Sequence, residues 1–116
     1  IRADFNDRIC TNEKLIAWCA FWGEAQSRPI YQERCGANDM AYIEMLQGVC
    51  ARLIAAEGYD LDAARAARVV RVTIEGVWLD LLSMTSPYTT DEALKTVYLS
   101  ASLLFPRNFT TAGLRR

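Results

Sequence analysis

The sequence predicts an all-α fold in a single domain, and three observations support that prediction. Apolar residues recur at spacings of three and four along most of the 116-residue chain, as they do on one face of a helix. The three prolines stand where helices can begin or end. There is no Asn-Gly or Asp-Gly turn and no long apolar–polar alternation that would predict a strand. A hydrophobic content of 52% allows a packed core and excludes a disordered chain.

The first two predicted segments cover residues 1–9 and about 12–26. Residues 1–9 carry Ile1, Phe5 and Ile9 at spacings of four, as the last turns of a helix would. We therefore expect the chain to begin within a helix, as a fragment of a longer protein does. In residues 12–26 apolar side chains cover every direction around the helix axis, which predicts a central, buried helix.

Two long helices are predicted next, over about residues 29–57 and 60–84. The first carries a stripe of apolar residues at spacings of three and four. It ends before Gly58, because glycine readily adopts the left-handed conformation that closes a helix. The second begins at Asp60, whose carboxylate is the expected N-cap.

A last helix is predicted over about residues 90–105. It opens on a capping-box pattern, in which the Thr89 side chain reaches forward and the Glu92 side chain reaches back. Pro106 stops it, because proline lacks the N–H that would continue the helix. The remaining residues, 106–116, are expected to form a loose C-terminal tail.

The last two predicted helices carry more apolar surface than one small domain can bury. The face that contains Gly76 lies opposite the row that contains Val70. Glycine inside a helix lowers the stability of the helix by about 1 kcal/mol, and it is favoured there only where another backbone approaches closely. We therefore expect a homodimer in which two helices of each chain form a four-helix bundle. The predicted dimer interface comprises Val72, Gly76, Leu79, Leu94, Val97 and Ala101. An open alternative is that a part of the protein outside this chain covers the same surface.

The residue types that most catalytic and metal sites use are missing or scattered. The chain has no histidine, which excludes Ser-His-Asp and Cys-His catalysis and imidazole ligands. No phosphate-binding loop or nucleophile motif occurs. The cysteines form no C-x-x-C pair, so we expect reduced, mostly buried thiols. These are Cys10, Cys19, Cys35 and Cys50. We expect no enzyme, no cofactor and no metal.

The charge and the longest apolar run also limit the partners of the chain. A formal net charge of −1 gives no general attraction to nucleic acid or to an acidic membrane. The longest apolar run, residues 15–22, is far shorter than the roughly 18–20 residues that span a bilayer. We expect a cytoplasmic protein without a membrane partner.

Several aromatic and acidic residues are candidates for a ligand site. Trp18 and Trp22 are one helical turn apart, and each indole face attracts a cation by about 0.5–2 kcal/mol. A buried carboxylate, of Glu75 or Asp80, could balance such a cation, and Tyr42 and Tyr98 could supply hydroxyls. The predicted ligand-binding residues are Trp18, Phe21, Trp22, Tyr42, Glu75 and Trp78. Two alternatives stay open: the aromatic residues could be core, and the carboxylates could pair with Arg71 or Arg68 at the surface.

Three stretches resemble a known family. Residues 17–23, Ala-Trp-Cys-Ala-Phe-Trp-Gly, resemble the A/T-W-L-A-F-W-A helix of the BetI-type repressors, the choline-responsive repressors of glycine betaine synthesis within the TetR family. Residues 63–68 resemble the family's Q-A-R-K-A-A-R, and residues 74–79 resemble its I-D-G-L-W-L. Cys19 stands where leucine is usual, and Asp80 stands where arginine is common.

The resemblance, which covers about residues 1–105, implies a fold and a function. Such regulators join an N-terminal helix-turn-helix domain to a helical ligand-binding and dimerisation domain, and residues 1–105 resemble the second domain alone. It implies a homodimer formed by the last two helices, and operator DNA bound only through the missing N-terminal domain. It also implies that choline or a related quaternary ammonium compound binds inside and releases the DNA. A TetR-type sensor of another hydrophobic or cationic inducer, and a helical protein–protein adaptor, stay open as alternatives.

Overall fold

The structure is a computed structural model that describes residues 1, 5, 20 and 29–115, with the backbone alone described for residues 29–38. In this part of the chain, three helices are followed by a short antiparallel hairpin. The elements are α2 (Pro29–Glu57), α3 (Ala63–Ser83), α4 (Thr90–Leu104), β1 (Phe109–Thr110) and β2 (Gly113–Leu114). The predicted all-α class is confirmed, while the helix expected over residues 12–26 lies outside the described residues.

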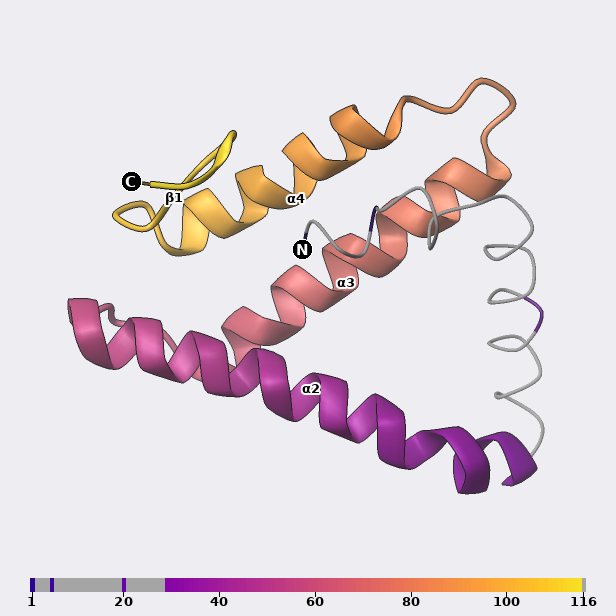
Figure 1. Ribbon diagram of the computed structural model, residues 1–116, viewed down its shortest axis with the longest axis horizontal. Coiled ribbons are helices and arrows are strands. Elements are labelled where there is room, and N and C mark those ends of the chain that lie inside the picture. Colours follow the sequence, from indigo (N-terminus) through magenta and orange to yellow (C-terminus); the bar gives the residue numbers. More distant parts are fainter. Residues whose placement is uncertain (2–4, 6–19, 21–28, 116) are drawn as a thin grey trace.

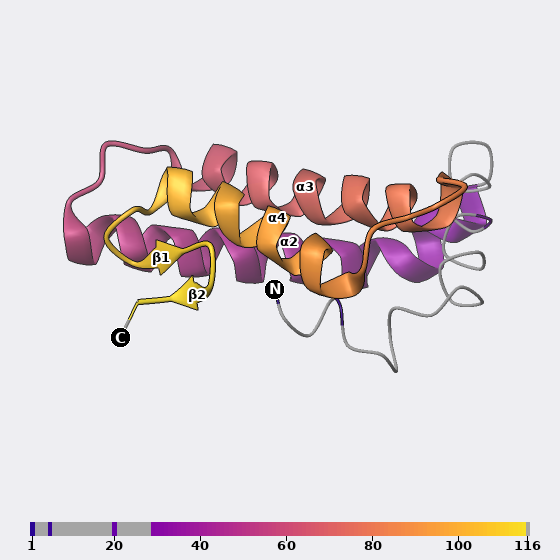
Figure 2. The ribbon, with the colours of Figure 1, turned by 90° about the horizontal axis from the view of Figure 1, so that it is seen from above.

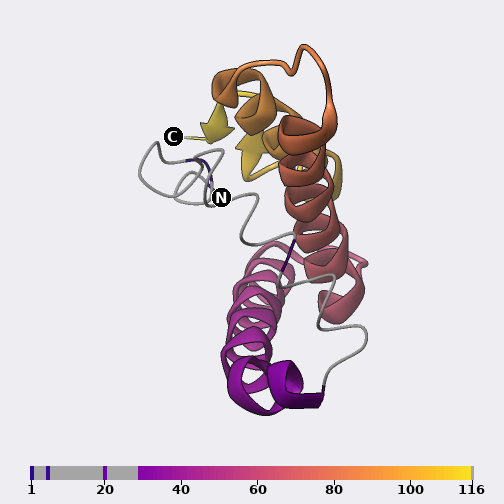
Figure 3. The ribbon, with the colours of Figure 1, turned by 90° about the vertical axis from the view of Figure 1, so that its right-hand side faces the viewer.

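The helices are arranged so that α3 joins the other two. From the loop at the end of α2, α3 runs diagonally to the start of α4, and α4 then returns toward the hairpin (Figure 1). Viewed from above, the hairpin lies beside the C-terminal end of α4 (Figure 2). Viewed from the side, α3 spans the distance between α2 and α4 (Figure 3). No helix in the described part of the chain is long and apolar enough to cross a membrane.

The ends of α2 and α3 follow local backbone chemistry. Gly58 has a φ of +69°, and its N–H donates to the Ile54 carbonyl at 2.9 Å, which confirms it as the residue that closes α2. The N-cap of α3 is Asp62, whose carboxylate accepts from the backbone N–H of Arg65 at 2.9 Å. The prediction of Asp60 as the cap is therefore wrong, because Asp62 itself has an extended backbone and the helix begins only after it.

The helix α4 starts where the sequence predicts, and its capping box contains the forward hydrogen bond to Thr89 but not the return bond from Glu92. The Thr89 hydroxyl accepts from the backbone N–H of Glu92 at 3.2 Å, as expected. The Glu92 carboxylate pairs instead with Lys95 at 3.1 Å. The helix ends at Leu104, two residues before Pro106, as the sequence predicts.

The buried residues form two clusters. The first fills the contact between α3 and α4 and comprises Phe5, Val70, Ile74, Val77, Leu81, Ala93 and Val97. The second joins α2, the start of α3 and the end of α4, and comprises Cys50, Ala66, Ala67 and Phe105. The helix α3 thus packs against both α2 and α4, whereas α2 and α4 meet only near one end.

The C-terminal tail is ordered as a hairpin, so the expectation of a loose tail is wrong. In this hairpin Phe109 pairs with Leu114, and Thr110 pairs with Gly113. Gly113 has a φ of +119°, a conformation that side chains rarely allow. The Thr110 hydroxyl accepts from the backbone N–H of Ala112 at 3.1 Å, which closes the turn without an Asn-Gly or Asp-Gly pair.

Candidate ligand-binding site

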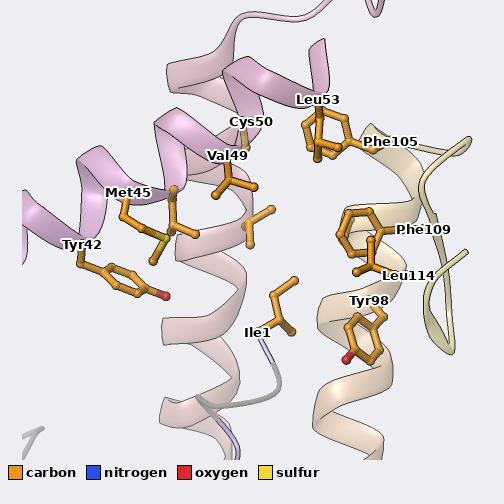
Figure 4. A pocket seen from close by; sticks show the side chains of 13 residues that line it. Ile1, Tyr42, Met45, Val49, Cys50, Leu53, Tyr98, Phe105, Phe109 and Leu114 are labelled. Carbon is orange, nitrogen blue, oxygen red and sulfur yellow. The ribbon is translucent and has the colours of Figure 1, made fainter. Parts of the chain in front are cut away.

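A cavity of about 420 Å³ lies between α2, α4 and the C-terminal hairpin, and we call it the α2–α4 cavity (Figure 4). Its volume is within the roughly 300–1,000 Å³ typical of small-molecule sites. The described residues that line it are Ile1, Tyr42, Met45, Leu46, Val49, Cys50, Leu53, Val70, Tyr98, Ala101, Phe105, Phe109 and Leu114. The cavity exists because α2 and α4 diverge from the cluster that joins them at one end.

The lining of the α2–α4 cavity is almost entirely apolar. None of its described residues is acidic or basic, and its polar side-chain groups are two tyrosine hydroxyls and one thiol. Four of its residues are aromatic: Tyr42, Tyr98, Phe105 and Phe109. Aromatic faces can hold either an apolar group or a cation without a carboxylate partner. The cavity is therefore suited to a compact ligand with an apolar or quaternary-ammonium body and one hydrogen-bonding group.

Cys50 lies in the wall of the cavity as a buried, free thiol. Burial raises the pKa of this thiol above its ordinary value of 9.0, so it stays protonated at neutral pH. A protonated, buried thiol is a poor nucleophile, and Cys50 therefore acts here as a small apolar residue. The other cysteines lie outside the residues whose side chains are described.

The structure brings one of the six predicted ligand residues to the cavity, namely Tyr42. Trp78 does not line it and instead packs, half-buried, against the α3–α4 core cluster. Trp18, Phe21 and Trp22 lie outside the described residues.

The two acidic candidates have partners on the chain itself. The Glu75 carboxylate pairs with Arg71 one helical turn earlier, with an N···O distance of 3.3 Å, and Glu75 does not line the cavity. This is the surface pairing that the sequence left open. Asp80 accepts a hydrogen bond from the Tyr88 hydroxyl at 2.8 Å. Burial first, and then the hydrogen bond and the negative charge of Asp80, raise the pKa of Tyr88 to about 12.

The predicted dimer residues on α3 lie on an exposed face. Val72 and Leu79 are 53% and 49% exposed, although both are large and apolar. Gly76 lies between them, and a Cβ added there would meet no described atom within 4 Å. The close approach expected at Gly76 is therefore not made within the described part of this chain, and the face is open.

The predicted dimer residues on α4 lie elsewhere. Val97 and Ala101 are fully buried in the chain's own core, and Leu94 packs half-buried against the same core. Val97 and Ala101 are therefore not accessible to a second chain, which corrects the assignment of these two residues, whereas Leu94 keeps part of its surface exposed. The exposed apolar residues of α4 are Leu99 and Leu103, on the opposite side of the helix.

Sequence reasoning missed the contribution of the hairpin to the cavity. Phe109 and Leu114 line it, yet the tail that carries them was expected to be loose. A signal was present in the tail, since two apolar residues flank a short polar stretch that ends in Gly113.

Comparison with known proteins agrees with this architecture. Residues 1–101 match the family described as "BetI-type transcriptional repressor, C-terminal". The HTH-type transcriptional regulators BetI of Pseudomonas paraeruginosa (strain DSM 24068 / PA7) and Pseudomonas aeruginosa (strain LESB58) are each 28% identical over 98 residues. The match covers 84% of this chain and 48% of each relative, so the chain spans about half the length of the curated relatives that it matches. No solved structure matches the chain significantly. On the extent of the family match, the chain belongs to the C-terminal domain family of the BetI-type transcriptional repressors, within the TetR family.

Proposed function

We propose that this chain is the effector-sensing and dimerising domain of a TetR-type repressor that regulates choline-to-glycine-betaine metabolism. The observation that supports sensing is the α2–α4 cavity, an apolar, aromatic-lined site of small-molecule size in a chain of the BetI-type family. In this proposal the effector binds in the cavity and releases operator DNA, which is contacted by a portion of the protein outside this chain.

The packing suggests how a ligand would act on the domain. The helix α3 packs against α4 through a core that contains Ile74 and Val97, which are 1% and 0% exposed, and it packs against α2 near its own start. The cavity, in contrast, separates α2 from α4 over much of their length. A ligand that contacts both walls would therefore favour one separation of α2 and α4. Such differential binding is what shifts a population between two arrangements.

Choline is the effector that the family relationship favours. Its quaternary ammonium group could lie against the rings of Tyr42, Tyr98, Phe105 and Phe109, at about 0.5–2 kcal/mol for each cation–ring contact. A neutral hydrophobic inducer is the second candidate. The observation in its favour is that no carboxylate lines the described part of the cavity, so nothing there neutralises a buried cation.

One titration separates the two candidates. Isothermal titration calorimetry records the heat of binding while choline, glycine betaine or 3,3-dimethylbutan-1-ol, the uncharged carbon isostere of choline, is added. Saturable binding of choline without binding of the isostere supports the choline assignment. Equal or tighter binding of the isostere supports a neutral hydrophobic inducer. No response to any of the three at millimolar concentration contradicts the choline-pathway assignment.

We also propose that the exposed face of α3 forms the dimer interface, through Val72, Gly76 and Leu79. The observation behind this proposal is the run of exposed apolar residues at spacings of three and four, with a glycine at which a second backbone could approach. Sedimentation velocity tests it. A dimer at tens of micromolar supports the proposal, and a monomer at that concentration contradicts it.

A further inference from the structure

We infer that the C-terminal hairpin, residues 107–115, is a wall of the α2–α4 cavity that selects ligands by the size of their hydrocarbon part. The inference rests on the proposed function, because it requires that the cavity hold a ligand. The family match ends at residue 101, whereas Phe105, Phe109 and Leu114 all line the cavity. Part of the binding wall therefore comes from a segment that the family match does not include.

The base of the hairpin is fixed by the loop between α2 and α3. The Tyr59 hydroxyl donates to Asn108 Oδ1 at 2.8 Å and accepts from the backbone N–H of Arg107 at 2.9 Å. The Arg107 guanidinium lies 4.5 Å from the centre of the Tyr59 ring, and that ring meets Phe105 edge-on at 5.4 Å. The chain's own residues make all of these contacts, so a ligand need not supply them.

The far end of the hairpin is seated on α4. A Cβ added at Gly113 would lie 3.4 Å from the ring of Tyr98, which itself lines the cavity. Phe109 and Leu114 are paired across the two strands, which places their side chains on one face of the hairpin. That face is the one turned toward the cavity (Figure 4).

The hairpin leaves apolar surface that a ligand can cover. Leu114 is 69% exposed, although it lines the cavity. Burying one additional methylene against such a surface strengthens binding by about fourfold. The ligands that this wall favours are therefore small amphiphiles with a hydrocarbon part longer than that of choline, whichever polar head group the rest of the cavity prefers.

Two homologous series of probes test the inference by isothermal titration calorimetry. One series is the 1-alkanols from butanol to octanol, and the other is the alkyltrimethylammonium ions with the same chain lengths. The variants are Leu114→Ser and a control, Leu103→Ser, which is similarly exposed at 75% but does not line the cavity. Light scattering confirms that both are compared in one oligomeric state, and circular dichroism confirms that both are folded.

In the unaltered chain we expect the affinity to rise about two- to fourfold with each methylene, in at least one series. Leu114→Ser should lower the affinity for the octyl member about tenfold and change that for the butyl member little, while Leu103→Ser should follow the unaltered chain. A further variant, Asn108→Ala, removes a hairpin contact without changing a lining residue, and it should also reduce the dependence on chain length.

The outcomes separate this inference from the function on which it rests. If the probes bind but all variants keep the same dependence on chain length, the hairpin is not a selecting wall and the inference is overturned, while the cavity stands as a site. If no member of either series binds the unaltered chain, the site and the inference are both overturned.

Discussion

Tyr59 connects three parts of the molecule through one side chain. Its hydroxyl bonds to two residues of the C-terminal segment, its ring packs on Phe105, and the Arg107 guanidinium covers the ring. The sequence gives no indication of this role, because Asn108 lies 49 positions away and the contact depends on the path of two helices. Sequence reasoning singled out Tyr42 and Tyr98 instead, and both line the cavity.

Replacing Tyr59 with phenylalanine keeps the ring contacts and removes both hydrogen bonds. We expect Tyr59→Phe to lower the free energy of unfolding by about 1–2 kcal/mol, since it also leaves Asn108 and the Arg107 N–H without this partner. Urea denaturation measures the change. The matched control is Tyr98→Phe, whose hydroxyl makes no hydrogen bond within the described residues, and it should change the value by less than about 0.5 kcal/mol. Equal losses in the two variants would contradict the role given to Tyr59.

Tyr88 should ionise far above the ordinary range for tyrosine. Its pKa is raised from 10.0 to about 12, because burial, the hydrogen bond to Asp80 and the charge of Asp80 all favour the neutral phenol. A raised pKa in the folded state means that the contribution of Tyr88 to stability is complete below pH 10 and is lost as the pH rises toward 12. The difference in absorbance near 295 nm between the unaltered chain and Tyr88→Phe reports this titration. Asp80→Asn should lower the pKa of Tyr88 only part of the way, because it removes the carboxylate and its charge but not the burial. A Tyr88 that titrates near 10 in the unaltered chain would contradict this account.

At the scale of the elements, the sequence predicts correctly those helix ends that are set by interactions between residues close together in the chain. The bounds of α2, the closing role of Gly58 and the cap at Thr89 follow from backbone chemistry within one turn, and the structure confirms them. The start of α3 was misplaced because two aspartates can cap a helix. Tertiary contacts favour the second, since Tyr59 and Leu61 pack against the second core cluster and the helix begins only after Asp62. The hairpin was missed for a related reason, because it is held by residues distant in sequence.

The two aspartates before α3 allow a direct test of the helix start. Asp62→Ala should lower the free energy of unfolding by about 1 kcal/mol, because the N–H of Arg65 loses its side-chain acceptor. Asp60→Ala should change it by less than about 0.5 kcal/mol, as expected of an exposed residue outside the cap. Thermal or urea unfolding measures both, and a larger loss in Asp60→Ala would show that the helix begins earlier.

At the scale of the whole molecule, α3 packs against both α2 and α4, and α2 and α4 diverge from the end where they meet. The sequence predicted that α3 has two apolar faces, and the structure shows one face in the core and the other exposed. Helical spacing could not show which face of α4 packs inward, so Val97 and Ala101 were assigned outward although they are buried. It also could not show the cavity, which depends on the angle between α2 and α4 and on the hairpin beside them.

If the exposed face of α3 is the dimer interface, a charged substitution should dissociate the dimer only when it lies on that face. We expect Leu79→Glu to convert a dimer into a monomer at tens of micromolar, because it places a charge in the apolar interface. Met40→Glu, at a similarly exposed position on α2, should leave the dimer intact. Sedimentation velocity distinguishes the two states. A dimer that survives Leu79→Glu, or one that dissociates equally in both variants, would show that the interface lies elsewhere.

The measurement that tests the central claim most directly is calorimetric titration of matched methionine variants with choline and with 3,3-dimethylbutan-1-ol. Met45 and Met40 are both on α2 and are 50% and 54% exposed, but only Met45 lines the α2–α4 cavity. We predict that at least one of the two ligands binds once per chain, about fivefold more weakly in Met45→Ser and with unchanged affinity in Met40→Ser. Failure of both ligands to bind, or equal weakening in the two variants, would contradict the assignment of this cavity as the effector site.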